Sequence, residues 1–138
     1  MLLRTEVENM NNQGEKKTIL VIEDEKILQQ ALSTKLVHEG FAVITADNGE
    51  DGLAIALAKH PDLILLDIIM PKMNGITTAQ KLATDAWGKT VPIIILTNLS
   101  DELKLTENFP KNVVDYLVKS DWEIGDIAGK IKEKLHIS

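Results

Sequence analysis

A single carboxylate lies in the middle of one of the most apolar stretches of this 138-residue chain. The stretch is LILLDIIMP, residues 63–71, and the carboxylate belongs to Asp67. Burying an unpaired charge costs several kcal/mol, which is on the order of the whole stability of a small domain. We therefore expect Asp67 either to reach the surface at the end of a strand or to lie beside a group that neutralises it.

Polar side chains also follow three other short apolar runs. They are Glu23, Asp24 and Glu25 after residues 19–22, Thr97 and Asn98 after residues 93–96, and Lys119 after residues 113–118. If the runs are parallel strands of one sheet, their carboxyl ends meet along one edge, where functional crevices form in such sheets. The polar groups of all four segments would then gather at that edge.

Such a cluster would hold two or three carboxylates, a hydroxyl and an ammonium. Carboxylates packed together raise one another's pKa unless a cation joins them, and hard oxygen ligands completed by water suit Mg²⁺. Lys119 could pair with Asp67 or with an anion attached to it, and Thr97 could donate a hydrogen bond to the same anion. A carboxylate nucleophile, a divalent cation and donors for the moving oxygens are what phosphoryl transfer requires.

The spacing of apolar residues predicts the elements that would position these groups. Strands are expected at residues 19–22, 41–44, 63–66, 93–96 and 113–118. Helices are expected at about residues 27–36, 53–58 and 75–85, from Ser100 toward Pro110, and from a capping-box pattern at 120–123 to Leu135. Five strands alternating with five helices indicate a parallel sheet covered on both faces. Right-handed crossovers then favour the flavodoxin-like, doubly wound α/β fold, with strand order 2-1-3-4-5.

Composition and charge exclude several classes of protein. The net charge is −6, so a nucleic acid or an anionic membrane gains no electrostatic attraction to this chain. The absence of cysteine excludes disulfides, thiol catalysis and cysteine-ligated metals. Residues 1–16 are too polar for a signal peptide, and no apolar stretch approaches the ~20 residues of a membrane span. We expect a flexible tail at 1–16, one domain at 17–138 and a cytoplasmic location.

Four motifs, in order along the chain, resemble those of the receiver domain of two-component response regulators. They are ILVIEDE, LILLDIIMPKMNG, IIILTN and DYLVK, and the similarity extends from about Lys17 to Leu135. The resemblance implies that Asp67 accepts a phosphoryl group from the phosphohistidine of a sensor histidine kinase or a histidine phosphotransfer protein. It also implies a signalling switch rather than an enzyme, acting on a downstream protein target.

The resemblance further implies a Mg²⁺ ion beside the phosphoacceptor. Asp24 would bind this ion directly, and Glu23 would act largely through water. Asp67 itself and the main-chain carbonyl of Ile69 would supply the remaining protein ligands.

Other positions match the family's signalling residues. Thr97 and Lys119 would contact the phosphoryl oxygens, and Tyr116 matches an aromatic residue that turns inward when Thr97 is drawn toward the phosphate. Pro71 and Gly75 would shape the loop after the acceptor. The face formed by the fourth helix, the fifth strand and the last helix would bind the target or form a homodimer.

The chain departs from the family pattern directly after Lys119. The next residue is usually a proline with a cis bond, but here it is Ser120. A cis bond before a non-proline residue costs ~3 kcal/mol, so we expect a trans loop or a strained exception, with Ser120 as a possible cap of the last helix. Apolar Ile69 and Leu99 flank the path of an attacking water, which predicts slow self-dephosphorylation.

Simpler interpretations exist for each residue taken alone. Asp67 could be a turn former, Glu25 a solvated residue in the first turn of a helix, and Tyr116 a half-buried packing residue. Chance would not, however, place so many suitable residue types at successive strand ends.

Functions of other kinds also compete. A pseudo-receiver would bind proteins without using phosphate, but the complete set of acceptor, acid, hydroxyl and lysine argues against it. A flavin-dependent electron carrier would need a phosphate-binding loop after the first strand, which is missing. An aspartate-nucleophile phosphatase would need a second aspartate where Ile69 stands. Because the chain ends soon after its last predicted helix, we expect a stand-alone switch, with a domain of a longer protein or a phosphorelay intermediate as alternatives.

Overall fold

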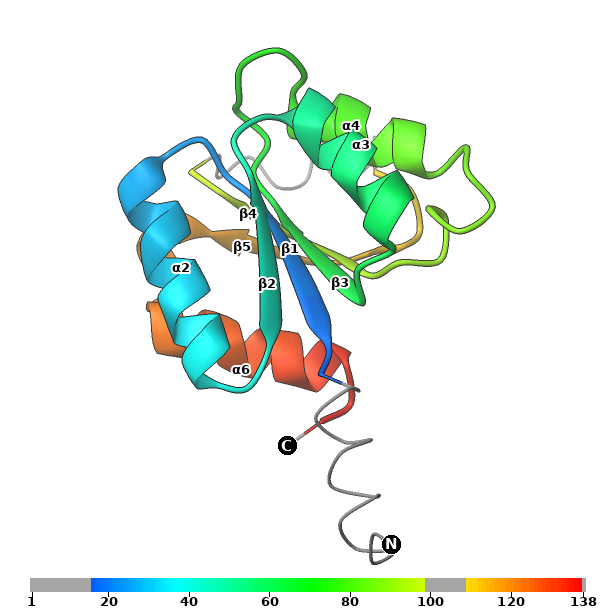
Figure 1. Cartoon of the computed structure of the whole chain (residues 1–138). Coiled ribbons are helices and arrows are strands. Elements are labelled where there is room, and N and C mark those ends of the chain that lie inside the picture. The colour runs from blue at the N-terminus through cyan, green and yellow to red at the C-terminus, as the bar shows by residue number, and fades with distance from the viewer. Residues whose placement is uncertain (1–15, 99–108, 138) are drawn as a thin grey trace, which may run out of the picture.

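Five parallel strands form the centre of the molecule (Figure 1). The computed structural model describes residues 16–98 and 109–137. The strands are β1 (Thr18–Ile22), β2 (Ala42–Ala46), β3 (Leu63–Leu66), β4 (Ile93–Thr97) and β5 (Val113–Val118). They pair in the order β2-β1-β3-β4-β5, which confirms the predicted topology. The three inner strands are almost fully buried, because helices cover both faces, and this burial explains why their sequences are continuous apolar runs.

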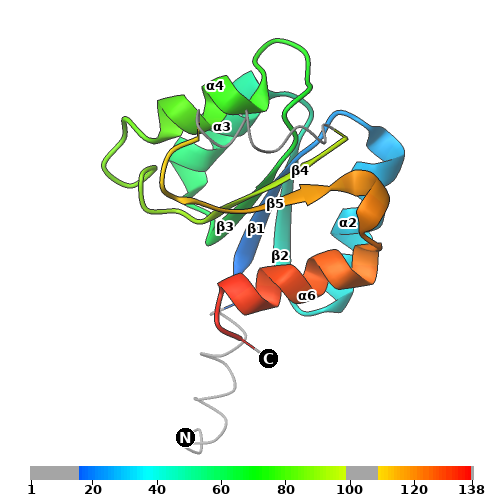
Figure 2. The same ribbon diagram turned by 180° about the vertical axis from the view of Figure 1, so that it is seen from behind.

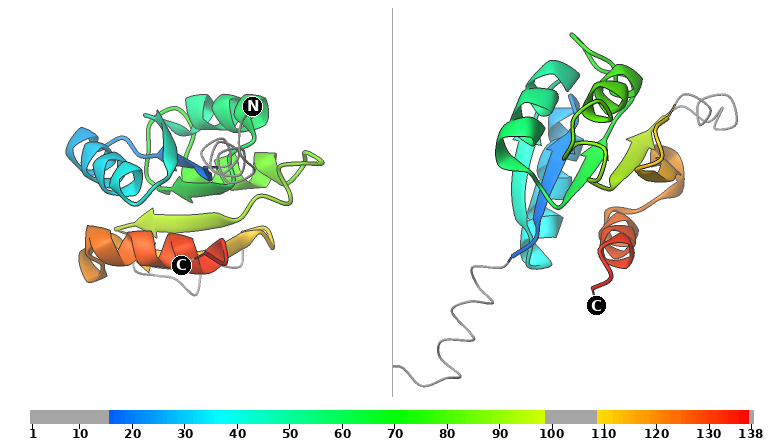
Figure 3. Two further views of the ribbon diagram at one scale, coloured as in Figure 1. Left: turned by 60° about the horizontal axis from the view of Figure 1, so that its bottom comes forward. Right: turned by 90° about the vertical axis from the view of Figure 1, so that its right-hand side faces the viewer.

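Two layers of helices enclose this sheet. Helices α2 (Lys26–His38) and α6 (Ile124–Lys134) pack together on one face (Figure 1). Helices α3 (Gly49–Lys59) and α4 (Gly75–Leu82) pack together on the other, as the reverse view in Figure 2 also shows. Figure 3 shows the same two layers from two further directions. In the part of the chain that the structure describes, no helix has the length and apolar character needed to cross a membrane.

Four of the five predicted helices are thus present. The remaining one, the fourth along the chain, was expected from Ser100 and lies outside the described residues. The tail predicted at residues 1–16 also lies almost entirely outside them.

The core consists of two apolar clusters, one on each side of the sheet. Successive residues of a strand point to opposite faces, so Ile19 and Val21 join the cluster beneath α2 and α6. Leu20 and Ile22 join the cluster beneath α3 and α4. Full burial of one such side chain is worth about 1.5–3 kcal/mol, so both clusters hold the strand ends in fixed positions.

The start of the last helix differs from the prediction. Residues Lys119–Asp121 form a separate 3₁₀ helix (η1), and α6 begins only at Ile124. Between them the backbone of Trp122 is extended, with φ −127° and ψ 133°, and its ring packs against the cluster beneath α2 and α6. The capping-box prediction, with Ser120 as the cap, is therefore wrong because inward packing of Trp122 interrupts the helical backbone. Glu123 is the N-cap instead, and its side chain makes no capping hydrogen bond.

Two smaller boundary predictions are also corrected. The second strand runs from Ala42 to Ala46 rather than over residues 41–44. Helix α4 ends at Leu82 rather than near Asp85, because the Asp85 carboxylate accepts hydrogen bonds from the amides of Trp87 (2.9 Å) and Gly88 (2.7 Å) and forms a turn there.

Candidate functional site

A small pocket lies at the carboxyl ends of β1, β3 and β4, and its volume is about 190 Å³. The residues that line it are Asp24, Glu25, Asp67, Ile69, Thr97 and Asn98. Sites for drug-sized ligands and cofactors usually measure ~300–1,000 Å³, so this pocket suits an ion and a small anion better than a flavin. The predicted convergence of polar strand ends on one edge is therefore observed.

Asp67 is the first residue after β3, and it is only 4% exposed. Its amide donates a hydrogen bond to the carbonyl of Ile22 (3.1 Å), which continues the pairing of β3 with β1. Its Oδ1 accepts a hydrogen bond from the amide of Ile69 (3.4 Å), and its Oδ2 accepts one from Lys119 Nζ (3.0 Å). The carboxylate in the apolar stretch is thus buried and neutralised, rather than exposed at the surface.

Gly75, the first residue of α4, lies directly against the backbone of Asp67. A Cβ atom on Gly75 would overlap the carbonyl oxygen of Asp67 and lie 2.8 Å from the Cα atom of Ile68. The amide of Gly75 also donates a hydrogen bond to the carbonyl of Ile68 (2.8 Å). A glycine is required at this position because α4 begins in direct contact with the loop that carries the carboxylate.

Lys119 joins the acidic residues of the site. Its Nζ lies 2.9 Å from Glu23 Oε1, 2.9 Å from Glu25 Oε1 and 3.0 Å from Asp67 Oδ2. Burial alone would lower the pKa of Lys119, but its hydrogen bonds to Glu25, Glu23 and Asp67 outweigh burial and raise the pKa above its ordinary value. The lysine is therefore held in its charged form. The described residues contain no cis peptide bond, so Lys119 precedes Ser120 in a trans loop.

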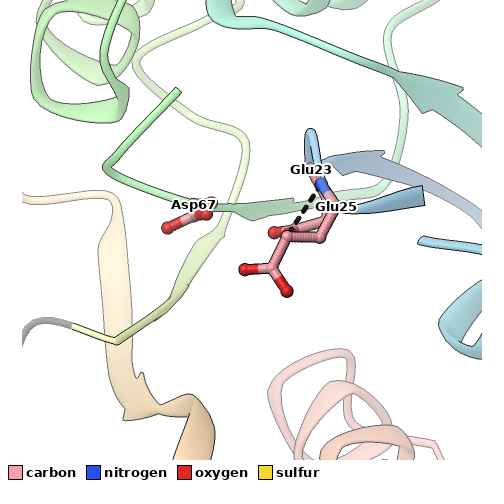
Figure 4. A group of neighbouring side chains, drawn as sticks. All are labelled: Glu23, Glu25 and Asp67. Carbon is pink, nitrogen blue, oxygen red and sulfur yellow. Dashed lines mark hydrogen bonds between the residues drawn. The ribbon is translucent and has the colours of Figure 1, made fainter. Parts of the chain in front are cut away.

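Glu23, Glu25 and Asp67 bring their carboxylates together at the ends of β1 and β3 (Figure 4), with one oxygen of each within 4.8 Å of the others. The side chain of Glu23 is only 3% exposed. Burial is the main cause that raises the pKa of Glu23 to about 7; its hydrogen bond from Lys119 opposes this rise, and the nearby charge of Asp67 adds to it. Asp24 is exposed and lines the same pocket from a position outside this trio.

The interpretation of Glu25 as a solvated residue at the start of a helix is correct but incomplete. Glu25 is the N-cap of α2 and its side chain is 55% exposed, yet its carboxylate accepts a hydrogen bond from Lys119. The sequence contained a signal for this contact, because Glu25 is the third acid in a run whose first two were assigned to the site.

Thr97 ends β4, where it is paired with Val118 of β5, and it is completely buried. Its Oγ1 has no hydrogen-bond partner among the residues that the structure describes. A buried hydroxyl without a partner costs about 1–3 kcal/mol. Thr97 is also one of the residues that line the pocket, so a ligand bound there is a candidate partner for its hydroxyl.

Tyr116 is half-buried on β5, where it is paired with Ile95. It packs against the cluster beneath α3 and α4, and its ring centroid lies 6.2 Å from that of Phe109. Ile69 lines the pocket and is 58% exposed, whereas Leu99, the other apolar residue expected there, lies outside the described residues.

Gln29 supports the site and was not identified from the sequence. It is buried on α2, and its Nε2 donates hydrogen bonds to the carbonyls of Glu23 (2.8 Å) and Ala46 (3.3 Å) and to Asp47 Oδ1 (2.9 Å). These bonds fix the loop after β1 to the end of β2. Its signal in the sequence is a polar residue three positions before Leu32, on the apolar face of the helix.

Comparison with known proteins identifies the family. A model of the response regulator receiver domain matches residues 19–131. This chain belongs to that family. Receiver domains are the signalling modules of two-component regulatory systems, which fits the acidic cluster and the fold.

Two curated relatives and one solved structure illustrate the similarity of this receiver domain to its family. "Probable transcriptional regulator ycf27" of Porphyra purpurea is 40% identical over 110 residues, which are 80% of this chain and 43% of that protein. "Response regulator ArlR" of Staphylococcus aureus strain Mu50 is 35% identical over 114 residues, or 83% of this chain and 50% of that protein. The receiver domain thus spans about half or less of the length of these relatives.

The solved structure is that of response regulator protein TrrA from Thermotoga maritima in complex with Mg²⁺-BeF. It is 31% identical to this receiver domain, with a TM-score of 0.72, and the match covers 85% of this chain and 97% of that one.

Proposed function

We propose that this receiver domain is a phosphorylation switch in which Asp67 accepts a phosphoryl group with the help of Mg²⁺. The observation that carries the proposal is the content of one pocket of about 190 Å³. It contains the buried Asp67, whose carboxylate lies 3.0 Å from Lys119 Nζ, and Thr97, whose buried hydroxyl has no hydrogen-bond partner within residues 16–98 and 109–137. These are a nucleophile and two donors for the oxygens of a transferred phosphoryl group.

The reaction follows from these groups. A carboxylate oxygen of Asp67 forms a bond to phosphorus while the bond from phosphorus to the donor's imidazole nitrogen breaks, and the imidazole keeps the electron pair. Lys119 and Thr97 donate hydrogen bonds to the phosphoryl oxygens, where negative charge must be stabilised during transfer. A sensor histidine kinase or a histidine phosphotransfer protein would supply the phosphohistidine.

The donor atoms of the site fit Mg²⁺. Four carboxylates, those of Glu23, Glu25, Asp67 and Asp24, and the one ammonium of Lys119 leave three negative charges in excess when all are ionised, and a divalent cation would offset most of this charge. Glu23, Asp24, Asp67 and the main-chain carbonyl of Ile69 would hold the ion, through oxygen ligands that Mg²⁺ prefers. When bound, Mg²⁺ supplies positive charge to the phosphoryl oxygens.

The signal would leave the pocket through β4 and β5. Movement of Thr97 toward the phosphoryl group displaces the end of β4, and Tyr116 lies on the neighbouring strand, opposite Ile95. We expect Tyr116 to change its packing in response and so to alter the face of β5 and α6. That face would bind the downstream protein or a second copy of the chain.

Intact-mass measurement tests the proposal after incubation of the protein with Mg²⁺ and acetyl phosphate. We expect one phosphoryl adduct, lost in Asp67→Asn and retained in Asp62→Asn. Asp62 is a matched control because it lies immediately before β3 and its Oδ2 accepts a hydrogen bond from the Thr18 amide (2.7 Å), away from the pocket. Absence of any adduct would favour a pseudo-receiver that acts only by protein contact.

The same measurement gives the lifetime of the adduct. We expect slow self-dephosphorylation, because the exposed apolar side chain of Ile69 lines the pocket and cannot orient an attacking water by hydrogen bonding. A half-life of only seconds without a phosphatase would contradict this expectation.

A further inference from the structure

Lys119 has no free proton for a new acceptor. An ammonium carries three N–H donors, and here each is matched by one carboxylate oxygen, of Glu23, Glu25 and Asp67, at 2.9, 2.9 and 3.0 Å. An incoming phosphoryl oxygen can therefore bind Lys119 strongly only if one of these acceptors leaves.

The three carboxylates differ in how easily they can leave. The side chains of Glu23 and Asp67 are only 3% and 5% exposed, so water cannot replace Lys119 as the partner of either carboxylate. The side chain of Glu25 is 55% exposed, and its carboxylate can return to water. Glu25 is thus the partner that Lys119 loses at the lowest cost.

The position of Glu25 also allows it to leave without disturbing the fold. It is the N-cap of α2, but its side chain makes no hydrogen bond to the amides of the helix. Its carboxylate instead accepts from Lys119, 94 residues later in the chain. Loss of that contact therefore removes no cap from α2 and leaves the buried pairs of Lys119 in place.

We propose that the carboxylate of Glu25 acts as an internal anion. It accepts one hydrogen bond of the Lys119 ammonium until an oxygen of a phosphoryl group replaces it there. This inference rests on the proposed function. Glu25 is then a positioning residue that acts through Lys119, and it weakens the binding of any tetrahedral anion on Asp67. Its removal should strengthen that binding, which is the opposite of what loss of a site residue usually does.

One other role for Glu25 predicts a different result. Its carboxylate lies within 4.8 Å of those of Glu23 and Asp67, so it could be a ligand of Mg²⁺. Removal of a metal ligand would weaken Mg²⁺ binding by tenfold or more. Competition for Lys119 instead predicts a gain in affinity for the anion once Mg²⁺ is saturating.

Isothermal titration calorimetry on the full chain separates these roles. Mg²⁺ affinity is measured first, and beryllofluoride affinity is then measured at saturating Mg²⁺. Beryllofluoride is the probe because it is a tetrahedral anion like a phosphoryl group. Glu25→Gln should bind it about two- to fivefold more tightly than wild type, the range that corresponds to one partly exposed ion pair. Glu133→Gln is the matched control, because Glu133 is 60% exposed and also pairs with lysines, on α6. It should match wild type.

A second variant tests whether Glu25 acts by contact or only by charge. Glu25→Asp keeps the charge, but its shorter side chain is a preferred N-cap and should turn to the amides of α2 instead of Lys119. We expect it to gain affinity for beryllofluoride, as Glu25→Gln does. If Glu25→Asp keeps wild-type affinity while Glu25→Gln gains, simple repulsion explains the gain and the proposal is wrong.

Two further results would also overturn the inference. One is unchanged or weaker beryllofluoride binding in Glu25→Gln while wild type binds normally; the proposed function then stands and only the role of Glu25 fails. The other is a tenfold loss of Mg²⁺ affinity without a gain for the anion, which would assign Glu25 to the metal. If wild type neither binds beryllofluoride nor forms the adduct on Asp67, the proposed function itself fails, and this inference fails with it.

Discussion

Helix α2 has a glutamate at each end, and the ratio of carboxylates to lysines around the two glutamates is opposite. At its N-terminus, Glu25 is one of three carboxylates around the single ammonium of Lys119. At its C-terminus, about 20 Å away for a helix of this length, Glu39 is a single carboxylate between two ammoniums. Those belong to Lys35 (3.1 Å) and Lys132 (2.7 Å).

The two ends show that surroundings, and not residue type, decide the charge of a glutamate. At the pocket end, burial is the main cause that raises the pKa of Glu23 to about 7. At the far end, hydrogen bonds from Lys132 and Lys35 lower the pKa of Glu39 to about 2.

The two clusters have different roles. The far cluster, which consists of Glu39, Lys35 and Lys132, joins the C-terminal end of α2 to α6, because Lys132 belongs to α6. The pocket cluster, which consists of Lys119, Glu23, Glu25 and Asp67, instead holds an excess of negative charge that the fold tolerates at a cost, as is common at functional sites.

The largest difference between the two clusters should appear in the free energy of unfolding, when a lysine of each cluster is replaced by methionine. Lys119→Met leaves Glu23 and Asp67 buried without their cation, and breaking such a pair costs about 3 kcal/mol or more. Lys132→Met removes one partner of Glu39 at the surface, where water and Lys35 remain as partners, so its loss of stability should be much smaller. Urea unfolding of both variants at pH 8, without Mg²⁺, measures the two losses. Equal losses of stability would mean that the pocket cluster does not contribute more to the stability of the fold than the far cluster does.

The fold and most of the site followed from the sequence for a physical reason. A parallel sheet covered on both faces requires fully apolar strands, so the runs that became β1, β3 and β4 stand out, and so does the polar residue that ends each run. Parallel pairing then brings those ends to one edge. Asp67 and Thr97 were predictable because their positions depend only on strand order and direction.

Other features depend on how far a side chain reaches, which spacing does not reveal. The contact of Glu25 with Lys119 joins residues 94 apart in sequence and requires that the glutamate turn away from its own helix. The late start of α6 follows from the inward packing of Trp122, although the residues before it form a good capping pattern. Gln29 was overlooked because its three acceptors become neighbours only after β2 pairs with β1.

A smaller effect should come from the raised pKa of Glu23. Its folded pKa of about 7 lies above the ordinary value of 4.5, so the folded protein binds this proton more tightly than the unfolded chain does. Stability should therefore fall as the pH rises from about 4.5 to 7, and then level off. In Glu23→Gln this part of the slope should disappear, and the variant should be more stable than wild type at pH 8 by up to about 3 kcal/mol. Urea unfolding across this pH range, with EDTA present, measures the effect.

The matched control for this prediction is Glu133→Gln. Glu133 is 60% exposed on α6 and lies outside the pocket, so Glu23 should titrate in this variant as it does in wild type. A Glu23→Gln variant with the wild-type slope would show that the burial of Glu23 does not perturb its titration.

The smallest effect on the pH dependence of stability should appear at the C-terminal end of α2. There the pKa of Glu39 is lowered, whereas that of Glu23 is raised. The folded pKa of Glu39, about 2, lies below the ordinary value of 4.5, so its contribution to stability is complete above pH 4.5 and is lost as the pH falls through 2. Because the hydrogen bond from Lys132 is the main cause, Lys132→Met should raise the pKa of Glu39 toward the ordinary value, with Lys35 still holding it lower. Carboxyl-carbon NMR titration of Glu39 measures the change.

Lys134→Met is the control, because Lys134 pairs with Asp115 and Glu133 instead, and it should leave the titration of Glu39 unchanged. An unchanged Glu39 titration in Lys132→Met would mean that this pair does not fasten α2 to α6, and the contrast between the two ends of the helix would be lost.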